Sequence, residues 1–165
     1  MERAELAAHI PRLRRYARAL VGDSHRADDL VQDTLERSMV KFHLWRRGSD
    51  MRAWLFTIMH NVFVNQLKTR RELALDDAAE AALQSAPQSD PLELRDLDAA
   101  LRQLPADQRE VLLLVGLEQL SYAETGKALG IPIGTVMSRL SRARERLREL
   151  MSVAPAAVAN LKVVK

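Results

Sequence analysis

The segment from 120 to 150 constrains the fold of this chain more than any other, because three local signals follow one another in it. Ser121 with Glu124 three residues later forms a capping box, which predicts a helix beginning directly after Ser121. Gly130 favours the left-handed conformation that ends a helix. Pro132 suits the first turn of a second helix, which should continue to about residue 150. The segment therefore predicts a helix-turn-helix.

The second helix of this motif has an apolar face and a polar face. The apolar residues recur at helical spacing and should face the core: Val136, Leu140, Ala143, Leu147 and Leu150. The polar face carries hydroxyl and guanidinium groups: Thr135, Ser138, Arg139, Arg142 and Arg146. Such groups suit base edges and phosphates. A solvated basic face on an ordinary helical hairpin is the alternative, but the capping box, the glycine turn and the hydroxyl groups together favour DNA binding.

The run from Gly134 to Arg144 resembles the promoter-reading motif of bacterial sigma factors, specifically the extracytoplasmic-function group. The resemblance implies that the polar face of this helix reads an upstream, minus-35-type element in duplex DNA.

Charge divides the chain into segments. Residues 1–71 contain 14 basic and 8 acidic residues, a net charge of +6, whereas residues 72–91 contain five acidic and no basic residues. Residues 92–150 contain nine of each. The acidic segment is rich in Ala, Ser and Pro, which is typical of a linker. We therefore expect an N-terminal domain at 1–71, a flexible linker at 72–91, a C-terminal domain at 92–150 and a tail at 151–165.

Apolar periodicity predicts three helices in residues 1–71, at about 3–21, 25–45 and 51–71. Pro11 either kinks the first helix or marks its start. Asp23 or Ser24 should cap the second helix, and Ser49 or Asp50 the third. The C-terminal domain should bury an apolar set within four helices: Leu94, Leu97, Leu101, Leu104, Leu112, Val115, Leu129 and Leu140.

The second helix carries a polar outer face at helical spacing, formed by Asp29, Gln32, Asp33 and Glu36. Plain solvation of these side chains is the alternative to a binding role, since acids early in a helix also favour its dipole. Residues 28–34 resemble the polymerase-binding helix of the sigma factor group. The resemblance implies that this face docks on the core RNA polymerase.

The third helix and the segment before it combine aromatic, basic and amide side chains that suit unstacked bases and a phosphate backbone. These residues are Trp45, Arg46, Arg47, Thr57, His60, Asn61, Lys68 and Arg71. Residues 52–58 followed by Asn61 resemble the promoter-opening helix of sigma factors, which implies contact with an opened minus-10-type element. A metal site formed by His43 and His60 is disfavoured, because the chain has neither Cys residues nor a His-Glu-x-x-His spacing near them.

The predicted fold is all-α, with two small helical domains joined by a flexible linker. The resemblance implies a dissociable RNA polymerase subunit that directs promoter-specific initiation in a stress or envelope response. It also implies an anti-sigma factor that controls the activity of this subunit. We expect no catalytic residues, cofactor or metal. No apolar run approaches the ~18 residues of a membrane span, and the absence of Cys is compatible with the cytoplasmic location we expect. The alternative is a stand-alone helix-turn-helix regulator that binds an operator as a dimer.

Overall fold

The computed structural model describes residues 2–76 and 92–153. Every regular element in these ranges is a helix, which confirms the all-α prediction. The elements are α1 (Glu2–Val21), α2 (Ser24–Val40), the short 3-10 helix η1 (Phe42–Leu44), α3 (Met51–Asp76), α4 (Leu92–Gln103), α5 (Ala106–Gly116), α6 (Tyr122–Leu129) and α7 (Ile133–Val153). None of the described helices is long and apolar enough to cross a membrane.

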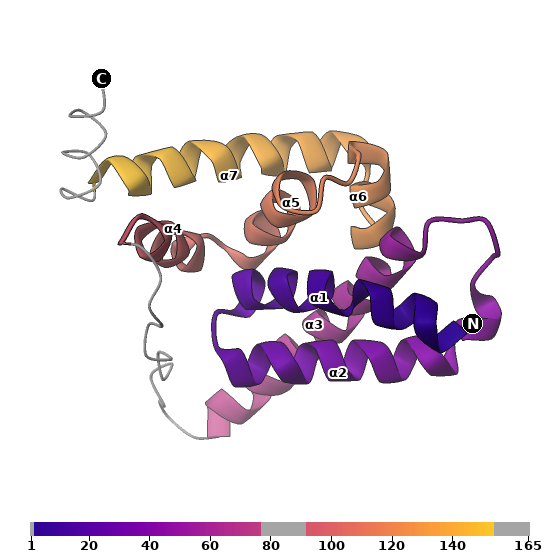
Figure 1. Ribbon diagram of the computed structural model, residues 1–165. Helices are drawn as coiled ribbons and strands as arrows, with labels where there is room; N and C mark the ends of the chain where they lie inside the picture. Colours follow the sequence, from indigo (N-terminus) through magenta and orange to yellow (C-terminus); the bar gives the residue numbers. More distant parts are fainter. Residues whose placement is uncertain (1, 77–91, 154–165) are drawn as a thin grey trace.

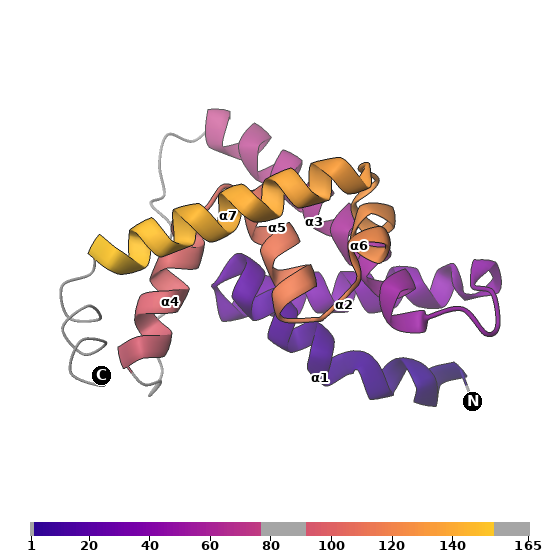
Figure 2. The ribbon, with the colours of Figure 1, turned by 90° about the horizontal axis from the view of Figure 1, so that it is seen from above.

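The helices form two layers that lie against each other (Figure 1). We call α1–α3 the first domain and α4–α7 the second domain. In the second domain, α7 runs along the outer side and crosses α5 and α4 (Figure 2). The two domains are in contact, α3 with α6 and α1 with both α4 and α5. The expected two-domain architecture is confirmed, and the described parts of the domains pack together.

The helix predicted at 25–45 ends earlier in the structure. α2 stops at Val40, and Phe42–Leu44 forms the 3-10 turn η1. This turn brings the Phe42 ring to 5.5 Å from Trp45 and 6.2 Å from Trp54 between ring centroids. Aromatic packing between elements therefore overrides the local helical pattern.

α3 is buried on more sides than the sequence pattern predicted. Besides the expected Leu55 and Val62, the side chains of Phe56, Met59 and Phe63 are buried. The reason is its position, because α2 packs on one side of α3 and α6 of the second domain on another. α3 also continues to Asp76, five residues into the segment we expected to be a linker, and residues 77–91 lie outside the described ranges.

Most of the predicted second-domain core is buried as expected. Leu101, Leu104, Leu129 and Leu140 are buried, while Leu97, Leu112 and Val115 are partly buried against the same cluster. Leu94 lies outside the residues with described side chains. Pro11 lies inside α1, so it does not mark the start of that helix.

Candidate nucleic-acid interface

The helix-turn-helix forms as its local signals predict. Ser121 Oγ accepts a hydrogen bond from the Glu124 amide, and Glu124 Oε1 accepts one from the Ser121 amide, both at 3.0 Å. α6 therefore begins at Tyr122, and it ends before Gly130, whose φ of 67° is left-handed. Pro132 directly precedes α7 and its carbonyl accepts a hydrogen bond from the Val136 amide. This turn places α7 on the outside of the molecule with its first turns accessible.

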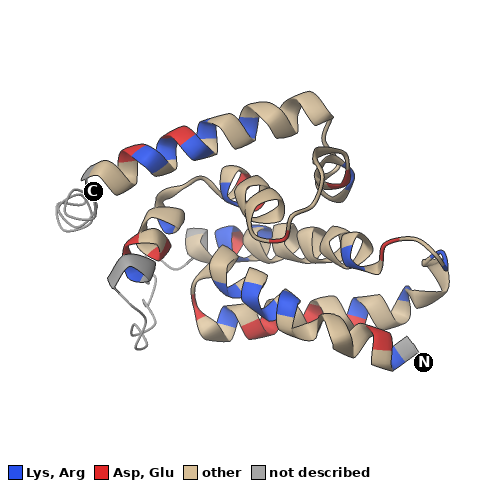
Figure 3. Ribbon diagram, turned by 45° about the horizontal axis from the view of Figure 1, so that its top comes forward, with Lys and Arg blue, Asp and Glu red and all other residues tan. Residues whose placement is uncertain are grey.

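The predicted DNA-binding residues of α7 are not equally available. Ser138, Arg142 and Arg146 are exposed and Thr135 is half-buried. The Arg139 side chain is 31% exposed, and its Nε lies 3.7 Å from the Asp107 carboxylate of α5. Blue segments lie along the C-terminal half of α7, interspersed with red ones (Figure 3). Arg142 is therefore more accessible to DNA than Arg139 on this face.

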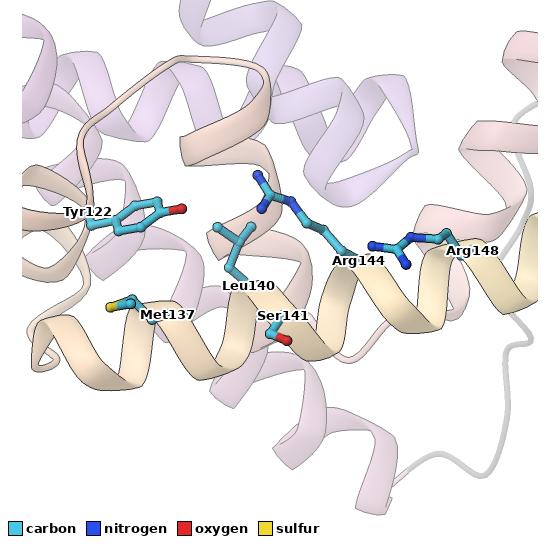
Figure 4. Close-up of a pocket in the computed structure, with 6 residues that line it drawn as sticks. All are labelled: Tyr122, Met137, Leu140, Ser141, Arg144 and Arg148. Atoms are coloured by element: carbon cyan, nitrogen blue, oxygen red, sulfur yellow. The ribbon is translucent and has the colours of Figure 1, made fainter.

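α7 has a second exposed stripe of residues that the sequence analysis did not predict. It borders a shallow pocket between α6 and α7 whose lining residues are Tyr122, Met137, Leu140, Ser141, Arg144 and Arg148 (Figure 4). Met137, at 52% exposure, lies in the first two turns of α7, where a base-reading side chain would be. The spacing 137, 141, 144, 148 is helical, and this periodicity was the signal that could have identified the stripe.

α2, which carries the predicted polar face, lies on the side of the first domain away from the second domain (Figure 1). Asp29, Gln32 and Glu36 are exposed, and Gln32 Nε2 donates to Glu36 Oε1 at 3.3 Å. Asp33 differs, because it is half-buried and its carboxylate accepts a hydrogen bond from Gln66 Nε2 of α3 at 3.0 Å. Asp33 therefore has a role in holding α2 to α3, whatever else it contacts.

The residues predicted for an opened strand fall into separate groups. Asn61, Lys68 and Arg71 are exposed along α3, and Arg46 and Arg47 are exposed in the loop before it. These five are the accessible part of the predicted set.

The remaining three residues of that set are engaged within the protein. Trp45 is half-buried against Phe42, and its indole N–H has no hydrogen-bond acceptor among the described residues. Thr57 donates to the Ala53 carbonyl at 2.9 Å. His60 Nδ1 lies 2.5 Å from Oε2 of Glu110 in α5. The polar face predicted on α3 is thus partly occupied by the second domain.

Two buried carboxylates at the contact between the domains were missed by sequence reasoning. Glu110 of α5 and Glu118 after it are only 5% and 2% exposed. Burial raises the pKa of Glu110, opposed by its hydrogen bond with His60. Burial also raises the pKa of Glu118, opposed by Arg15. Their charge repels the phenolate form of buried Tyr16, whose pKa is raised well above 10.0, mainly by burial.

The described residues contain no group of three or more potential metal-binding side chains. Both histidines considered as a metal pair have other contacts. His43 Nδ1 lies 3.1 Å from the Val40 carbonyl oxygen, and His60 is joined to Glu110.

Comparison with known proteins identifies relatives along most of the chain. Residues 94–147 match the family described as Sigma-70, region 4, and residues 6–60 match the Sigma2 domain of PhyR. The extracytoplasmic-function RNA polymerase sigma factor EcfG of Rhodopseudomonas palustris is 43% identical over 154 residues, which are 92% of this chain and 85% of that protein. SigM of Bacillus subtilis, another such factor, is 32% identical over 141 residues, covering 82% of this chain and 86% of SigM.

A solved structure agrees with these relatives. The sigma factor RpoE from Bartonella quintana, crystallised with the anti-sigma factor NepR, has a TM-score of 0.81 to this chain and 39% identity. The match covers 92% of this chain and 97% of RpoE. The likeness therefore includes both domains.

Proposed function

Because the chain belongs to the extracytoplasmic-function family of RNA polymerase sigma factors, we propose that its two domains divide promoter recognition between them. The second domain reads a minus-35-type element in duplex DNA. The first domain binds the core polymerase and holds an opened minus-10-type element. The observation that carries this proposal is the 43% identity to EcfG across 92% of the chain, which includes both domains.

The exposed polar face of α7 supports the role of the second domain. Ser138, Arg142 and Arg146 lie on accessible turns, and a bidentate Arg is the commonest specific reader of guanine. Thr135 lies at the start of the same helix, where hydroxyl groups suit phosphates. Arg139 is assigned a lesser role, because its pairing with Asp107 competes with DNA.

The accessible side chains of the first domain support its two roles. Asp29, Gln32 and Glu36 form an exposed polar face on α2 that suits a basic partner surface on the polymerase. Asn61 on α3 and Arg46 in the preceding loop lie free for base and phosphate contacts.

We assign this chain an anti-sigma partner and no catalytic activity of its own. RpoE of Bartonella quintana, at 39% identity, is held by the anti-sigma factor NepR. A partner that covers the polar face of α2 would compete with the polymerase. We place the protein in the cytoplasm, where the core polymerase is, and in a stress or envelope response.

Run-off transcription with purified core polymerase on genomic fragments tests the proposal. Reversing the charges of Asp29 and Glu36 to Lys should abolish co-migration with the core and promoter-specific transcripts, while helicity stays normal, since exposed charges contribute little to stability. The matched control reverses Glu5 and Glu72, which are also exposed. Equal transcription from both variants would remove α2 from the polymerase interface.

The same experiment distinguishes a sigma factor from the alternative function, a stand-alone helix-turn-helix regulator. A stand-alone regulator would bind an operator tightly as a dimer without polymerase, whereas a sigma factor binds promoter duplex weakly on its own. Absence of any core-dependent transcript, together with tight dimeric binding to one fragment, would overturn the sigma factor assignment.

A further inference from the structure

The first two turns of α7 present large apolar side chains to solvent. Ile133 and Met137 are 49% and 52% exposed, and they lie one turn apart on the same side of the helix. Tyr122 at the start of α6 is also exposed, and it borders the same pocket as Met137 (Figure 4). We call Ile133, Met137 and Tyr122 the apolar patch. Exposed apolar side chains that gather in one place and have a polar rim are typical of a binding surface.

The pocket beside the apolar patch is too small for a typical small-molecule ligand. Its volume is about 220 Å³, whereas such sites usually enclose ~300–1,000 Å³. Leu140, which is only 2% exposed, contributes further apolar atoms to its lining. The surface therefore suits a small apolar group that projects from a larger partner.

The cations next to the apolar patch favour nucleic acid over protein as that partner. Arg144 and Arg148 lie further along the same stripe of α7, both exposed (Figure 4). Neither makes an ion pair or a hydrogen bond within the part of the chain that the structure describes. A protein that covered only the apolar patch would leave these two guanidinium groups without counter-charges, whereas DNA supplies a phosphate at every nucleotide.

The length of α7 matches this arrangement. The helical rise places Arg144 about 10 Å from Met137 along the axis, and Arg148 about 16 Å. The major groove of B-DNA is ~12 Å wide, and the first residues of a recognition helix are those that contact base edges. When Met137 lies in the groove, the two arginines are therefore spaced to reach phosphates at its edge.

The chemistry of Met137 limits which base it can read. A thioether donates no hydrogen bond and accepts one only weakly. In the major groove, guanine, cytosine and adenine present hydrogen-bonding groups, whereas thymine also presents a C5 methyl group. Packing that methyl group against Met137 removes apolar surface of both partners from water. The flexible side chain of Met adapts well to such a contact.

We propose that Met137, with Ile133 one turn before it, reads the C5 methyl group of a thymine in the upstream promoter element. This inference rests on the minus-35-type role proposed above for the second domain, and it adds the identity of one base. Ser138 and Arg142 on the neighbouring face read their partners through hydrogen bonds. Met137 instead selects thymine through one methyl group, so the loss of that group weakens binding.

Selection from a duplex pool with a randomised upstream element tests the base preference. The full-length chain is used alone at low salt, which strengthens DNA binding, and again when bound to core polymerase. One position should be enriched in thymine, and Met137→Ala should remove that enrichment while preferences at the other positions stay. Met39→Ala is the matched control, because Met39 is 51% exposed but belongs to α2, and it should change no preference. Thymine enrichment that persists in Met137→Ala would overturn the proposal.

Deoxyuridine in place of that thymine isolates the methyl group, because the two bases differ only there. One buried methyl group changes affinity by about fourfold. The unaltered chain should therefore bind the uracil duplex about fourfold less tightly, whereas Met137→Ala should bind both duplexes equally. Met137→Leu keeps an apolar side chain and should retain the difference. Equal binding of both duplexes by the unaltered chain would rule out methyl reading.

Transcription distinguishes this inference from the proposed function. Core-dependent transcripts that do not differ between thymine and uracil promoters would keep the sigma factor role and overturn methyl reading. A methyl-dependent preference of the chain alone, without any core-dependent transcript, would keep methyl reading and overturn the sigma factor role. If Met137→Ala weakens co-migration with the core and lowers transcription from all promoters alike, the apolar patch binds polymerase and the methyl contact is wrong.

Discussion

Replacing Arg109 with Lys should destabilise the second domain although the charge is kept. The Arg109 guanidinium donates four hydrogen bonds to backbone carbonyls, which are those of Leu101 at 2.7 Å, Leu20 at 2.7 Å, Arg102 at 3.1 Å and Leu104 at 2.8 Å. Three of these carbonyls lie in or just after the last turn of α4, whose orphan acceptors need partners. The fourth lies in α1, so this one side chain ties α5 to both α4 and the first domain.

The expected magnitude follows from this geometry. A Lys ammonium is a point donor that cannot reproduce a planar fork, so it keeps about one of the four bonds. Hydrogen bonds from charged groups contribute ~1.5–3 kcal/mol each, and carbonyls at a helix end regain water when released. Losing three bonds with about half of their value restored by water gives a decrease of roughly 2–4.5 kcal/mol in the free energy of unfolding.

Urea unfolding measures this change with two signals. Circular dichroism reports all helices, whereas fluorescence reports the first domain, since Trp45 and Trp54 are the only tryptophans of the chain. Arg109→Lys should lower the midpoint by circular dichroism more than by fluorescence. Arg14→Lys, at an exposed position of α1, is the control and should be neutral. A decrease below about 0.5 kcal/mol, which is typical of surface substitutions, would refute the reasoning.

Three further predictions concern the site. Arg142→Ala should reduce promoter-specific transcription more than Arg139→Ala, with a loss of about 1–3 kcal/mol in binding if Arg142 reads a base; equal run-off yields would contradict the assigned ranking. Asn61→Ala should slow promoter opening more than core binding, as measured by permanganate reactivity of promoter thymines, and normal opening would remove Asn61 from the strand site. Burial raises the pKa of Glu110 and Glu118 above the ordinary 4.5, so the folded state binds more protons. Their stabilisation is therefore present at low pH and lost as pH rises through the folded pKa values. Urea unfolding from pH 5 to 7 should show a smaller loss of stability after both are changed to Gln, and parallel curves would contradict it.

The sequence correctly predicted those local features of this chain that depend on residues close together in sequence. The capping box of Ser121 and Glu124, the end of α6 at Gly130 and the cap of α2 by Asp23 were confirmed. Each depends on hydrogen bonds within a few residues, so the sequence contains all the groups involved. The apolar face of α7 was confirmed for the same reason, because helical periodicity alone selects it.

Helical periodicity predicted only part of the arrangement of the candidate binding residues. Their positions on exposed helix faces followed from periodicity, as for Arg142 and Asp29. The ion pair of Arg139 with Asp107 and the hydrogen bond from Gln66 to Asp33 could not be read from spacing, because the partners lie in other helices. The roles of all these residues in DNA and polymerase binding stay predictions.

The sequence by itself determined that the chain forms two helical domains, with a helix-turn-helix in the second, and it indicated the sigma factor family through motifs in both. Only the tertiary structure decided that His60 faces Glu110 and that Glu118 lies among arginines of α1. The physical reason is distance along the chain. These partners are 50 to 106 positions apart, and no local pattern marks a Glu for burial. Its burial becomes acceptable only when folding of a different segment supplies the opposing charge.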